Sequence, residues 1–270
     1  MNIRLTDQTN ASAADLEPFA NLKTQKNTTN FIAESEKVVV SLLASDLEIS
    51  SLYLTPEHFN EKRDSIEAHR QESHAQVIIA PKSEMEAIVG YPLHQGIMAA
   101  AKIPKEQSLD DLIIRGKKPQ LFIILDTIAD AENIGALYRT ALAMGATAII
   151  LDDKSISPWI RRAIRVSMGA VFSLPTVTVS NLTETIEYLN SKDISTFAAE
   201  IDGKSKRLYD VNFSSDVAIV FGSEGHGVSR EVLNQCSDII EIPMNEGVKS
   251  LNITVAQGMV LYEVVRQRSS

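Results

Sequence analysis

One buried strand that runs into a glycine-rich loop constrains the fold of this 270-residue chain more than any other feature. The run Val217–Phe221 is uninterrupted and rich in β-branched residues, which is typical of a strand buried in a sheet. It leads directly into Gly222-Ser-Glu-Gly-His-Gly227. Three glycines in six residues let the backbone turn sharply and approach a ligand without a clash from Cβ atoms. The sequence therefore predicts a buried strand followed by a loop that is able to approach a ligand.

The chain beyond this loop predicts one more strand and a C-terminal helix. The short apolar run Ile239–Ile242 stops at Pro243, which cannot continue a central sheet ladder. A loop over Asn245–Ser250 follows. From Asn252 to Val265, apolar residues recur at helical spacing, which predicts an amphipathic helix with Val255, Met259, Tyr262 and Val265 on its apolar stripe.

Three segments of the chain resemble the motifs of a known family. FGSEGHGVS at 221–229 and IPMNEGVKSLNITVA at 242–256 resemble the second and third motifs of the SpoU (TrmH) family of RNA 2′-O-ribose methyltransferases, in the SPOUT class. The segment LDTIADAENIGALYRTALAMGA at 125–146 resembles the first motif, with Asn133, Gly135 and Arg139 in its N-x-G-x-x-x-R arrangement. A glycine-rich loop alone is a weak signal, but three motifs in the family's order and spacing are a specific one.

The resemblance implies a fold and a cofactor. It implies an α/β domain with a SPOUT-type parallel sheet and a C-terminal trefoil knot, preceded by a small α/β ribosomal-protein-like RNA-binding domain. The methyl donor it implies is S-adenosyl-L-methionine, whose transfer needs positioning rather than a metal or a covalent nucleophile. The cofactor-binding residues it implies are Gly222, Ile242, Met244, Ser250 and Leu251.

The resemblance also assigns catalysis to Asn133, Arg139, Glu224 and Asn252. Arginine is a poor general base because its pKa lies above about 12. We therefore expect Arg139 to hold a substrate phosphate and stabilise the developing alkoxide; the alternative is an ion pair that pins a helix end. Asn133 could cap its helix or order the loop. Glu224 could fix either Arg139 or the loop, and Asn252 would hold the third motif.

Two positions depart from the family pattern. Ala131 follows Asp130 where relatives usually have Asp-Pro. In the third motif, Glu246 stands where relatives have glycine, and Gly247 comes one residue later. The second departure predicts a reshaped loop whose carboxylate points toward the cofactor site.

The N-terminal part of the chain predicts a separate α/β layer domain, because helical and strand patterns alternate from Phe31 onward. Its segments NFIAESEKVVVSLLAS and YPLHQGIMAAA resemble the family's RNA-binding domain, although Glu34-Ser35 stands where relatives have Glu-Gly. The expected elements are helices at 31–44, 56–71 and 83–89 and strands at 49–54, 76–80 and 95–101. A short helix is expected at 15–21 in the polar N-terminus.

We expect four parts: a polar extension at 1–30, the RNA-binding domain at 31–103, a linker at 104–118 with a helical turn at 110–114, and the methyltransferase domain at 119–270. In the last part, strands at 121–125 and 148–151 flank a helix at 133–145, which predicts a parallel pair with a right-handed crossover. Gly145 is expected to end that helix as its C′ residue. Further strands are expected at 172–179 and 196–200, and a helix at 182–190.

Composition limits how this chain can bind RNA. Its net charge of −9 argues against indiscriminate binding, which depends on phosphate contacts, so positive charge must be gathered in a patch. Arg161, Arg162 and Arg165 form such a cluster. They are either an RNA-binding patch or a solvated helix face.

Other classes are excluded by what the sequence lacks. The single cysteine, Cys236, cannot form a disulfide framework and suits a reducing cytosol. There is no Cys/His spacing of the zinc type, so no metal site is expected. No apolar run is long enough to span a bilayer, and the N-terminus has no signal-peptide core. A cytoplasmic location is therefore expected.

These features predict an S-adenosylmethionine-dependent methyltransferase that acts on the 2′-hydroxyl of structured RNA, with ribosomal RNA the first expected substrate and transfer RNA the second. The apolar stripe of the C-terminal helix needs a partner, so a homodimer through the C-terminal domain is expected. One alternative is a non-catalytic RNA-binding protein of the same fold. Another is a dinucleotide-binding oxidoreductase, which the absence of G-x-G-x-x-G after a first strand opposes.

Overall fold

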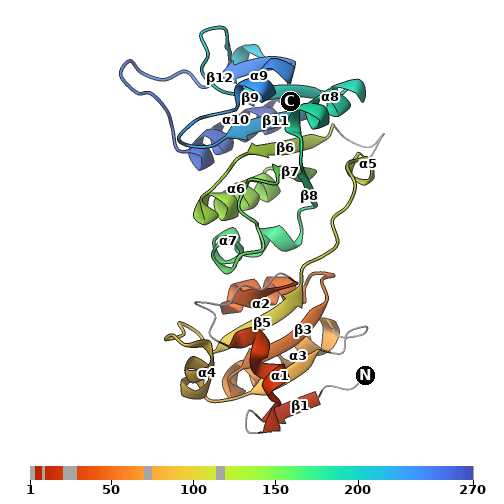
Figure 1. The fold of residues 1–270 in the computed structure, drawn as a ribbon, viewed down its shortest axis with the longest axis vertical. Coiled ribbons are helices and arrows are strands. Elements are labelled where there is room, and N and C mark those ends of the chain that lie inside the picture. The colour runs from red at the N-terminus through yellow and green to blue at the C-terminus, as the bar shows by residue number, and fades with distance from the viewer. Residues whose placement is uncertain (1–3, 8–9, 21–28, 70–74, 114–118, 270) are drawn as a thin grey trace. The chain divides into compact units, whose positions relative to one another are not determined.

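The computed structural model describes residues 4–7, 10–20, 29–69, 75–113 and 119–269. The chain divides into two compact units (Figure 1). The first contains residues 1–105 together with 159–173, and the second contains 106–158 together with 174–270. Among the described residues, no helix is both long enough and apolar enough to cross a membrane.

The first unit is built on a mixed five-stranded sheet in the order β1-β4-β3-β5-β2. The strands are β1 (Arg4–Asp7), β2 (Asn30–Glu34), β3 (Ile49–Leu54), β4 (Gln76–Ile79) and β5 (Ile97–Lys102). The helices are α1 (Ala13–Leu16), the 3-10 turn η2 (Glu17–Phe19), α2 (Glu36–Leu43), α3 (Pro56–His69) and α4 (Lys82–Val89). The expected alternation of strands and helices is confirmed, while β1 adds a strand within the polar extension.

The segment expected to be helical from Phe31 begins as a strand, so this part of the prediction was wrong. Phe31, Ile32 and Ala33 are buried, and they pair antiparallel with β5. Ser35 then takes φ 87° and ψ 149°, which breaks the chain direction before α2 begins at Glu36. The helical spacing lies only in the second half of the segment, where Val38, Val39, Leu42 and Leu43 are buried.

The second unit is built on a seven-stranded sheet in the order β10-β12-β9-β11-β6-β7-β8. Every neighbouring pair in it is parallel, which confirms the predicted parallel sheet. The strands are β6 (Leu121–Asp126), β7 (Ala148–Asp152), β8 (Thr176–Val179), β9 (Ser195–Ala199), β10 (Lys206–Arg207), β11 (Val217–Gly222) and β12 (Asp238–Glu241). The run that predicted a buried strand is thus β11, which lies between β9 and β6.

Short helices and one long helix complete the second unit. They are α5 (Leu109–Leu112), α6 (Ala131–Ala143), α8 (Leu182–Ser191), the 3-10 turn η4 (Leu208–Asp210), α9 (Arg230–Gln235) and α10 (Ile253–Arg268). Asp130 caps α6, since its Oδ1 accepts from Glu132 N and Asn133 N at 2.7 and 3.0 Å. The suggestion that Asn133 caps this helix was therefore wrong. Gly145 follows the C-cap at φ +72°, as predicted for a C′ residue.

Residues 159–173 pack with the first unit. They form α7 (Arg161–Ser167) and the 3-10 turn η3 (Ala170–Phe172), so the strand expected from Phe172 begins only at Thr176. The Phe31 ring lies 5.1 Å from that of Trp159 and 5.4 Å from that of Phe172, measured between centroids. These aromatic contacts hold the segment against β2.

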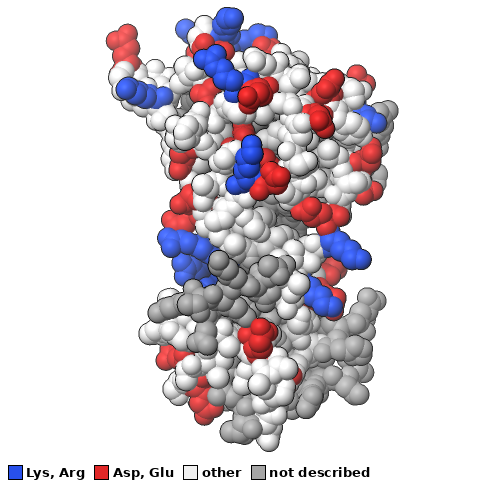
Figure 2. Space-filling view, viewed as in Figure 1, with Lys and Arg blue, Asp and Glu red and all other residues white. Residues whose placement is uncertain are grey.

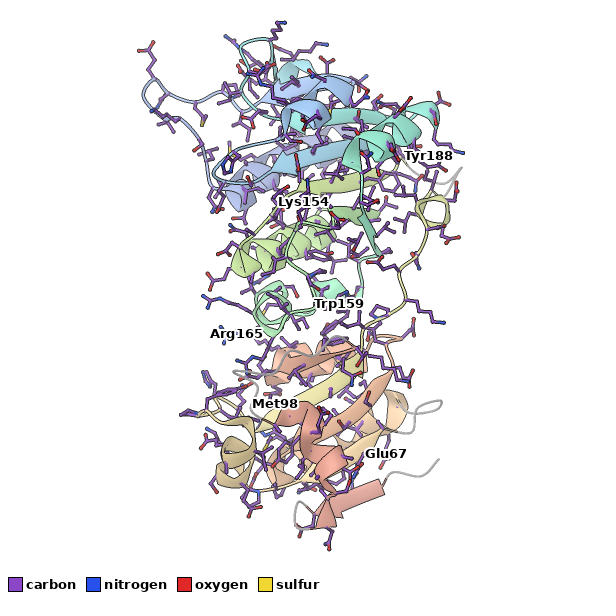
Figure 3. All side chains as sticks on the ribbon, viewed as in Figure 1. Glu67, Met98, Lys154, Trp159, Arg165 and Tyr188 are labelled. Carbon is purple, nitrogen blue, oxygen red and sulfur yellow. The ribbon has the colours of Figure 1, made fainter. Side chains whose placement is uncertain are left out.

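Part of the expected linker packs into the second unit. Leu112 of α5 is buried in its core. Tyr188 of α8, which Figure 3 labels, donates a hydrogen bond to Asp110. The expected helical turn at 110–114 is observed as α5, although residues 114–118 lie outside the described ranges.

The end of α10 is tied to the amino-terminal ends of β6 and β11. The Arg268 guanidinium donates to the carbonyl oxygens of Phe213, Pro119, Gln120 and Ser215 at 2.6–2.9 Å. Burial of this guanidinium lowers the pKa of Arg268. The trefoil knot that the family resemblance implies stays a prediction.

Candidate active site

The loop after β11 closes on itself. Gly227 N donates to Ser223 O at 2.7 Å, and Gly227 takes φ +67°. A Cβ on Gly222 would lie 2.1 Å from the carbonyl carbon of Gly227. Both glycines are therefore required by the loop's own backbone, in addition to any approach of a ligand.

Two carboxylates from the flanking strands hold this loop. Val228 N donates to Glu200 Oε2 at 3.0 Å, and Ser229 N donates to Asp126 Oδ2 at 2.8 Å. Glu200 follows β9 and Asp126 ends β6, the two neighbours of β11. Sequence reasoning missed both residues. The available signal was an acidic residue at the carboxyl end of a predicted strand.

Three of the four expected catalytic residues meet in one hydrogen-bonded cluster. Asn133 Nδ2 donates to Glu224 Oε1 at 2.5 Å, and Asn252 Nδ2 donates to the same oxygen at 3.0 Å. Asn252 also caps α10, since its Oδ1 accepts from Thr254 N at 2.9 Å. Each motif thus supplies one side chain to a single contact. Glu224 holds the loops together, which is the second of the two roles expected for it, rather than a contact with Arg139.

Arg139 is not part of this cluster within one chain. Its side chain is exposed, and it makes no hydrogen bond or ion pair with the residues that the structure describes. A residue six positions along an α-helix from Asn133 lies about 9 Å further along the axis and points about a third of a turn away. Neither the expected contact between Glu224 and Arg139 nor an ion pair that pins a helix end is therefore formed.

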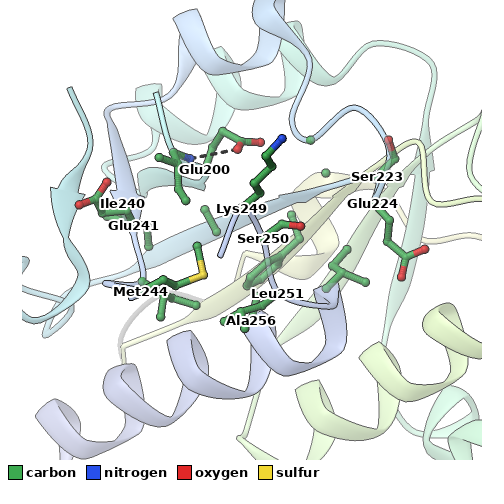
Figure 4. A pocket seen from close by; sticks show the side chains of 17 residues that line it. Glu200, Ser223, Glu224, Ile240, Glu241, Met244, Lys249, Ser250, Leu251 and Ala256 are labelled. Carbon is green, nitrogen blue, oxygen red and sulfur yellow. Dashed lines mark hydrogen bonds between the residues drawn. The ribbon is translucent and has the colours of Figure 1, made fainter. Parts of the chain in front are cut away.

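All five expected cofactor-binding residues line one cavity of about 180 Å³ (Figure 4). Its walls come from the carboxyl ends of β9, β11 and β12, from the loop of the third motif and from the start of α10. Apolar side chains such as Phe221, Ile240 and Ala256 are joined there by Glu200, Glu241 and Lys249. Gly222, Ile242, Met244, Ser250 and Leu251 complete the lining.

A second hollow, of about 520 Å³, lies against the first-motif loop. Its lining includes Asp130, Asn133 and His226. The two cavities share Ser223, Glu224 and Ile253. Glu224, the acceptor at the centre of the hydrogen-bonded cluster, therefore borders both spaces, an arrangement that suits the transfer of a group from one bound molecule to another.

The third-motif departure does not reach either cavity. Glu246 is exposed and lines neither of them, so the expectation that its carboxylate points at the cofactor site was wrong. Gly247 takes φ +89°, a conformation that favours glycine, so this loop turns at 247. The first-motif departure is benign, because Ala131 occupies the first position of α6, where proline is common but not required.

The three clustered arginines differ in their surroundings. The guanidinium of Arg161 lies 4.5 Å from the ring centroid of Tyr91, donates to its hydroxyl and lies 3.7 Å from Glu34 Oε2. Arg162 and Arg165 are exposed. Figure 2 shows basic side chains gathered at the position that Figure 3 labels Arg165, on a face where acidic and basic residues are otherwise interspersed. Arg161 is thus engaged within its own unit.

Comparisons with known families agree with the geometry. The profile of the SpoU rRNA Methylase family matches residues 120–262, and the profile described as RNA 2′-O ribose methyltransferase substrate binding matches residues 36–107. Two similar proteins are 23S rRNA (guanosine-2′-O-)-methyltransferases RlmB. The one from Ralstonia nicotianae is 35% identical over 196 residues, which cover 72% of this chain and 78% of the relative. The one from Pseudomonas putida is 32% identical over 226 residues, which cover 82% and 89%.

Solved structures share the fold over nearly the whole chain. A putative RNA methyltransferase of the TrmH family from Porphyromonas gingivalis is 25% identical, with a TM-score of 0.79 over 95% of this chain and 98% of that one. An AdoMet-bound rRNA methyltransferase from Sinorhizobium meliloti is 23% identical, with a TM-score of 0.82 over 97% and 98%. With a family profile that covers more than half of its length, this chain belongs to the SpoU rRNA methylase family.

Proposed function

We propose that this chain transfers a methyl group from S-adenosylmethionine to a ribose 2′-hydroxyl of ribosomal RNA, with a guanosine of 23S rRNA as the acceptor. One observation carries the proposal: Asn133 and Asn252, from the first and third motifs, both donate to Glu224 of the second motif, and Glu224 lines both cavities. The names of the curated relatives support ribosomal RNA over transfer RNA and favour catalysis over the non-catalytic alternative.

The lining of the smaller cavity fits S-adenosylmethionine. Its apolar walls suit an adenosine, its carboxylates suit a cation, and Lys249 suits the ligand's carboxylate. Gly222, Ile242 and Leu251 would hold the cofactor, with Met244 and Ser250 beside it. When bound, the cofactor supplies a methyl group attached to a positively charged sulfur. An oxygen nucleophile can attack the carbon of that methyl group.

The cluster would orient the acceptor ribose. Glu224 Oε1 accepts from both asparagines, whereas Oε2 accepts no hydrogen bond from the described residues. Oε2 is thus available to accept a hydrogen bond from a ribose hydroxyl in the adjoining hollow. Arg139 would hold a phosphate and stabilise negative charge on the attacking oxygen, a role that suits its side chain, which is exposed and has no partner among the described residues.

The remaining parts would bind the RNA and a second copy of the chain. The domain at 31–103, with Arg162 and Arg165 of α7, would contact structured RNA, while Arg161 contacts Tyr91 and Glu34 within its own unit.

The α10 helix exposes Val255, Met259 and Tyr262 by 50, 45 and 62%, beside a groove of about 590 Å³. A homodimer through this face would cover these apolar side chains and complete a site with residues from both chains. The enzyme would be knotted and cytoplasmic, as the family resemblance and the sequence predict.

Methylation of purified ribosomal RNA with isotope-labelled S-adenosylmethionine tests the proposal, with transfer RNA as the control. Mass spectrometry of nuclease digests should locate one 2′-O-methylated ribose in 23S rRNA, absent from a strain that lacks the gene. Tight RNA binding without methyl transfer would instead support the non-catalytic alternative.

Light scattering at micromolar protein concentration should give the mass of a dimer. A monomer mass would reject the proposed interface.

A further inference from the structure

Glu200 is a charged residue of the cofactor cavity that none of the three motifs contains. It follows β9 at its carboxyl end and lines the cavity together with two other carboxylates, those of Glu224 and Glu241. Among the described residues, Lys249 is the one basic residue of this lining. Three carboxylates and one lysine leave the cavity with net negative charge.

The Glu200 carboxylate is held in place by backbone groups. Its Oε1 accepts from Ile201 N at 3.0 Å (Figure 4). Its Oε2 accepts from Val228 N at 3.0 Å. A Cβ on Gly227 would lie 2.0 Å from Oε2, so the loop approaches the carboxylate as closely as a glycine allows. Hydrogen bonds from neutral amides fix the carboxylate without cancelling its charge.

No lysine or arginine among the described residues forms an ion pair with the Glu200 carboxylate, although Lys249 lines the same cavity. The other two carboxylates accept hydrogen bonds from side chains instead. Glu224 accepts from Asn133 and Asn252, and Glu241 Oε2 accepts from Ser205 Oγ at 2.5 Å. Glu200 is thus a carboxylate of this lining that two backbone amides hold in place and that keeps its charge unpaired among the described residues.

The methyl donor and its product differ in charge at one atom. S-adenosylmethionine carries a positively charged sulfonium, whereas S-adenosylhomocysteine carries a neutral thioether, and the rest of the two molecules has the same charged groups. A fixed carboxylate attracts the sulfonium and has no net charge to attract in the thioether. Discrimination between the two is a difference of affinities, and shape contributes little to it.

We propose that Glu200 is a specificity-determining residue that shifts the preference of this cavity toward the cationic methyl donor and away from its neutral product. The inference rests on the proposed function, since it takes the cavity to be the cofactor site. It predicts a role in turnover as well, because a weaker hold on the product favours its release.

Calorimetric titration of the full chain with S-adenosylmethionine, S-adenosylhomocysteine and sinefungin tests the proposal. Sinefungin carries a protonated amine near the position of the sulfonium. Glu200→Gln should lower the ratio of donor to product affinity by roughly three- to thirtyfold, the range expected for one carboxylate in a partly screened site. Sinefungin affinity should fall with that of the donor.

Two further variants separate charge from shape. Glu200→Asp keeps the charge but shortens the side chain, so both affinities fall while their ratio stays near that of the wild type. Glu246→Gln removes a charge from the same region at a residue outside the cavity lining, and should leave the ratio unchanged. Glu200→Asp and Glu246→Gln remain informative even if the Glu200→Gln variant folds less well.

The outcomes distinguish the inference from the function on which it rests. If the wild-type chain binds neither ligand, the proposed function fails. If both ligands bind and Glu200→Gln leaves their ratio unchanged, the function stands and the role of Glu200 is overturned. An equal loss of ratio in Glu200→Asp and Glu200→Gln would show that shape, not charge, is responsible.

Discussion

The side-chain amide of Asn133 donates to the carboxylate of Glu224 at 2.5 Å, although the two residues are 91 positions apart in the chain. The contact joins the helix of the first motif to the loop of the second. Asn252 donates to the same oxygen from the third motif, so Glu224 is the hub of the cluster.

Asn133→Asp should abolish most methyl transfer, because it replaces a donor with a second carboxylate beside Glu224. Two like charges at this distance repel and disfavour the shared geometry. Steady-state kinetics should show at least a hundredfold loss in kcat. The matched control is Asn212→Asp, in an exposed turn where the side chain acts as an acceptor to Ser214 N, and it should leave kcat unchanged.

Arg139→Ala should lower the rate by on the order of a hundred- to a thousandfold if the guanidinium stabilises charge in the transition state. The melting temperature should hardly change, because this exposed side chain has no partner among the described residues. Arg139→Lys should restore little, since it keeps the charge and loses the planar fork. Single-turnover rates and calorimetric cofactor affinity check this, and near-normal turnover of Arg139→Ala would reject the role.

Ser35→Gly should raise the free energy of unfolding of the first unit by about 1 kcal/mol. Ser35 occupies φ 87° and ψ 149°, a region where a residue with a Cβ is strained by about 1–3 kcal/mol, part of which the greater freedom of unfolded glycine offsets. Urea unfolding monitors the change.

The matched comparison is Thr127→Gly, at φ 59°. The Thr127 hydroxyl contacts the carboxylates of Asp126 and Asp152 at 3.1 and 3.0 Å, so its removal should destabilise the second unit despite the relief of strain. Stabilisation by both substitutions would mean that backbone conformation alone governs these positions.

Gln257→Leu should stabilise the second unit by about 1–3 kcal/mol. The Gln257 side chain is fully buried on α10, and neither its Nε2 nor its Oε1 has a hydrogen-bond partner among the described residues. Leucine has a similar volume and carries no polar group to desolvate.

A second glutamine of the same helix is the control for this substitution. Gln267 Oε1 accepts from Phe213 N at 2.8 Å and its Nε2 donates to Val211 O at 2.9 Å. Gln267→Leu should therefore destabilise the unit, and thermal unfolding should give the two leucine variants opposite signs.

Glu263 should make stability depend on pH in the acid range. Hydrogen bonds from Arg266 and Gln267 lower the pKa of this carboxyl to about 2. Because the folded pKa lies below the unfolded one, ionised Glu263 favours the folded state above the unfolded pKa of about 4.3, and this advantage disappears as pH falls toward 2.

Glu263→Gln should accordingly reduce the free energy of unfolding at pH 7 and have progressively less effect toward pH 3. Urea titrations of both proteins across this range measure the difference. A difference that stays constant with pH would show that the ionised carboxylate is not what stabilises the helix end.

Local patterns in the sequence determined much of this protein. The uninterrupted run Val217–Phe221 predicted β11, because burial of a strand is encoded in neighbouring residues. The family resemblance named Asn133, Glu224 and Asn252, and these side chains share one contact, while their roles stay a prediction. The strand β2 was missed because Phe31 and Ile32 owe their extended conformation to pairing with β5, about seventy residues away.

Tertiary structure alone decided how the site is held together. The order β9-β11-β6 brings Glu200 and Asp126 to consecutive amides of one loop, and no local pattern encodes that order. The separation of Arg139 from Asn133 is instead local, because the turn of α6 points the two side chains in different directions. A sequence motif specifies which residues take part, and only the packing of distant elements specifies which of them meet.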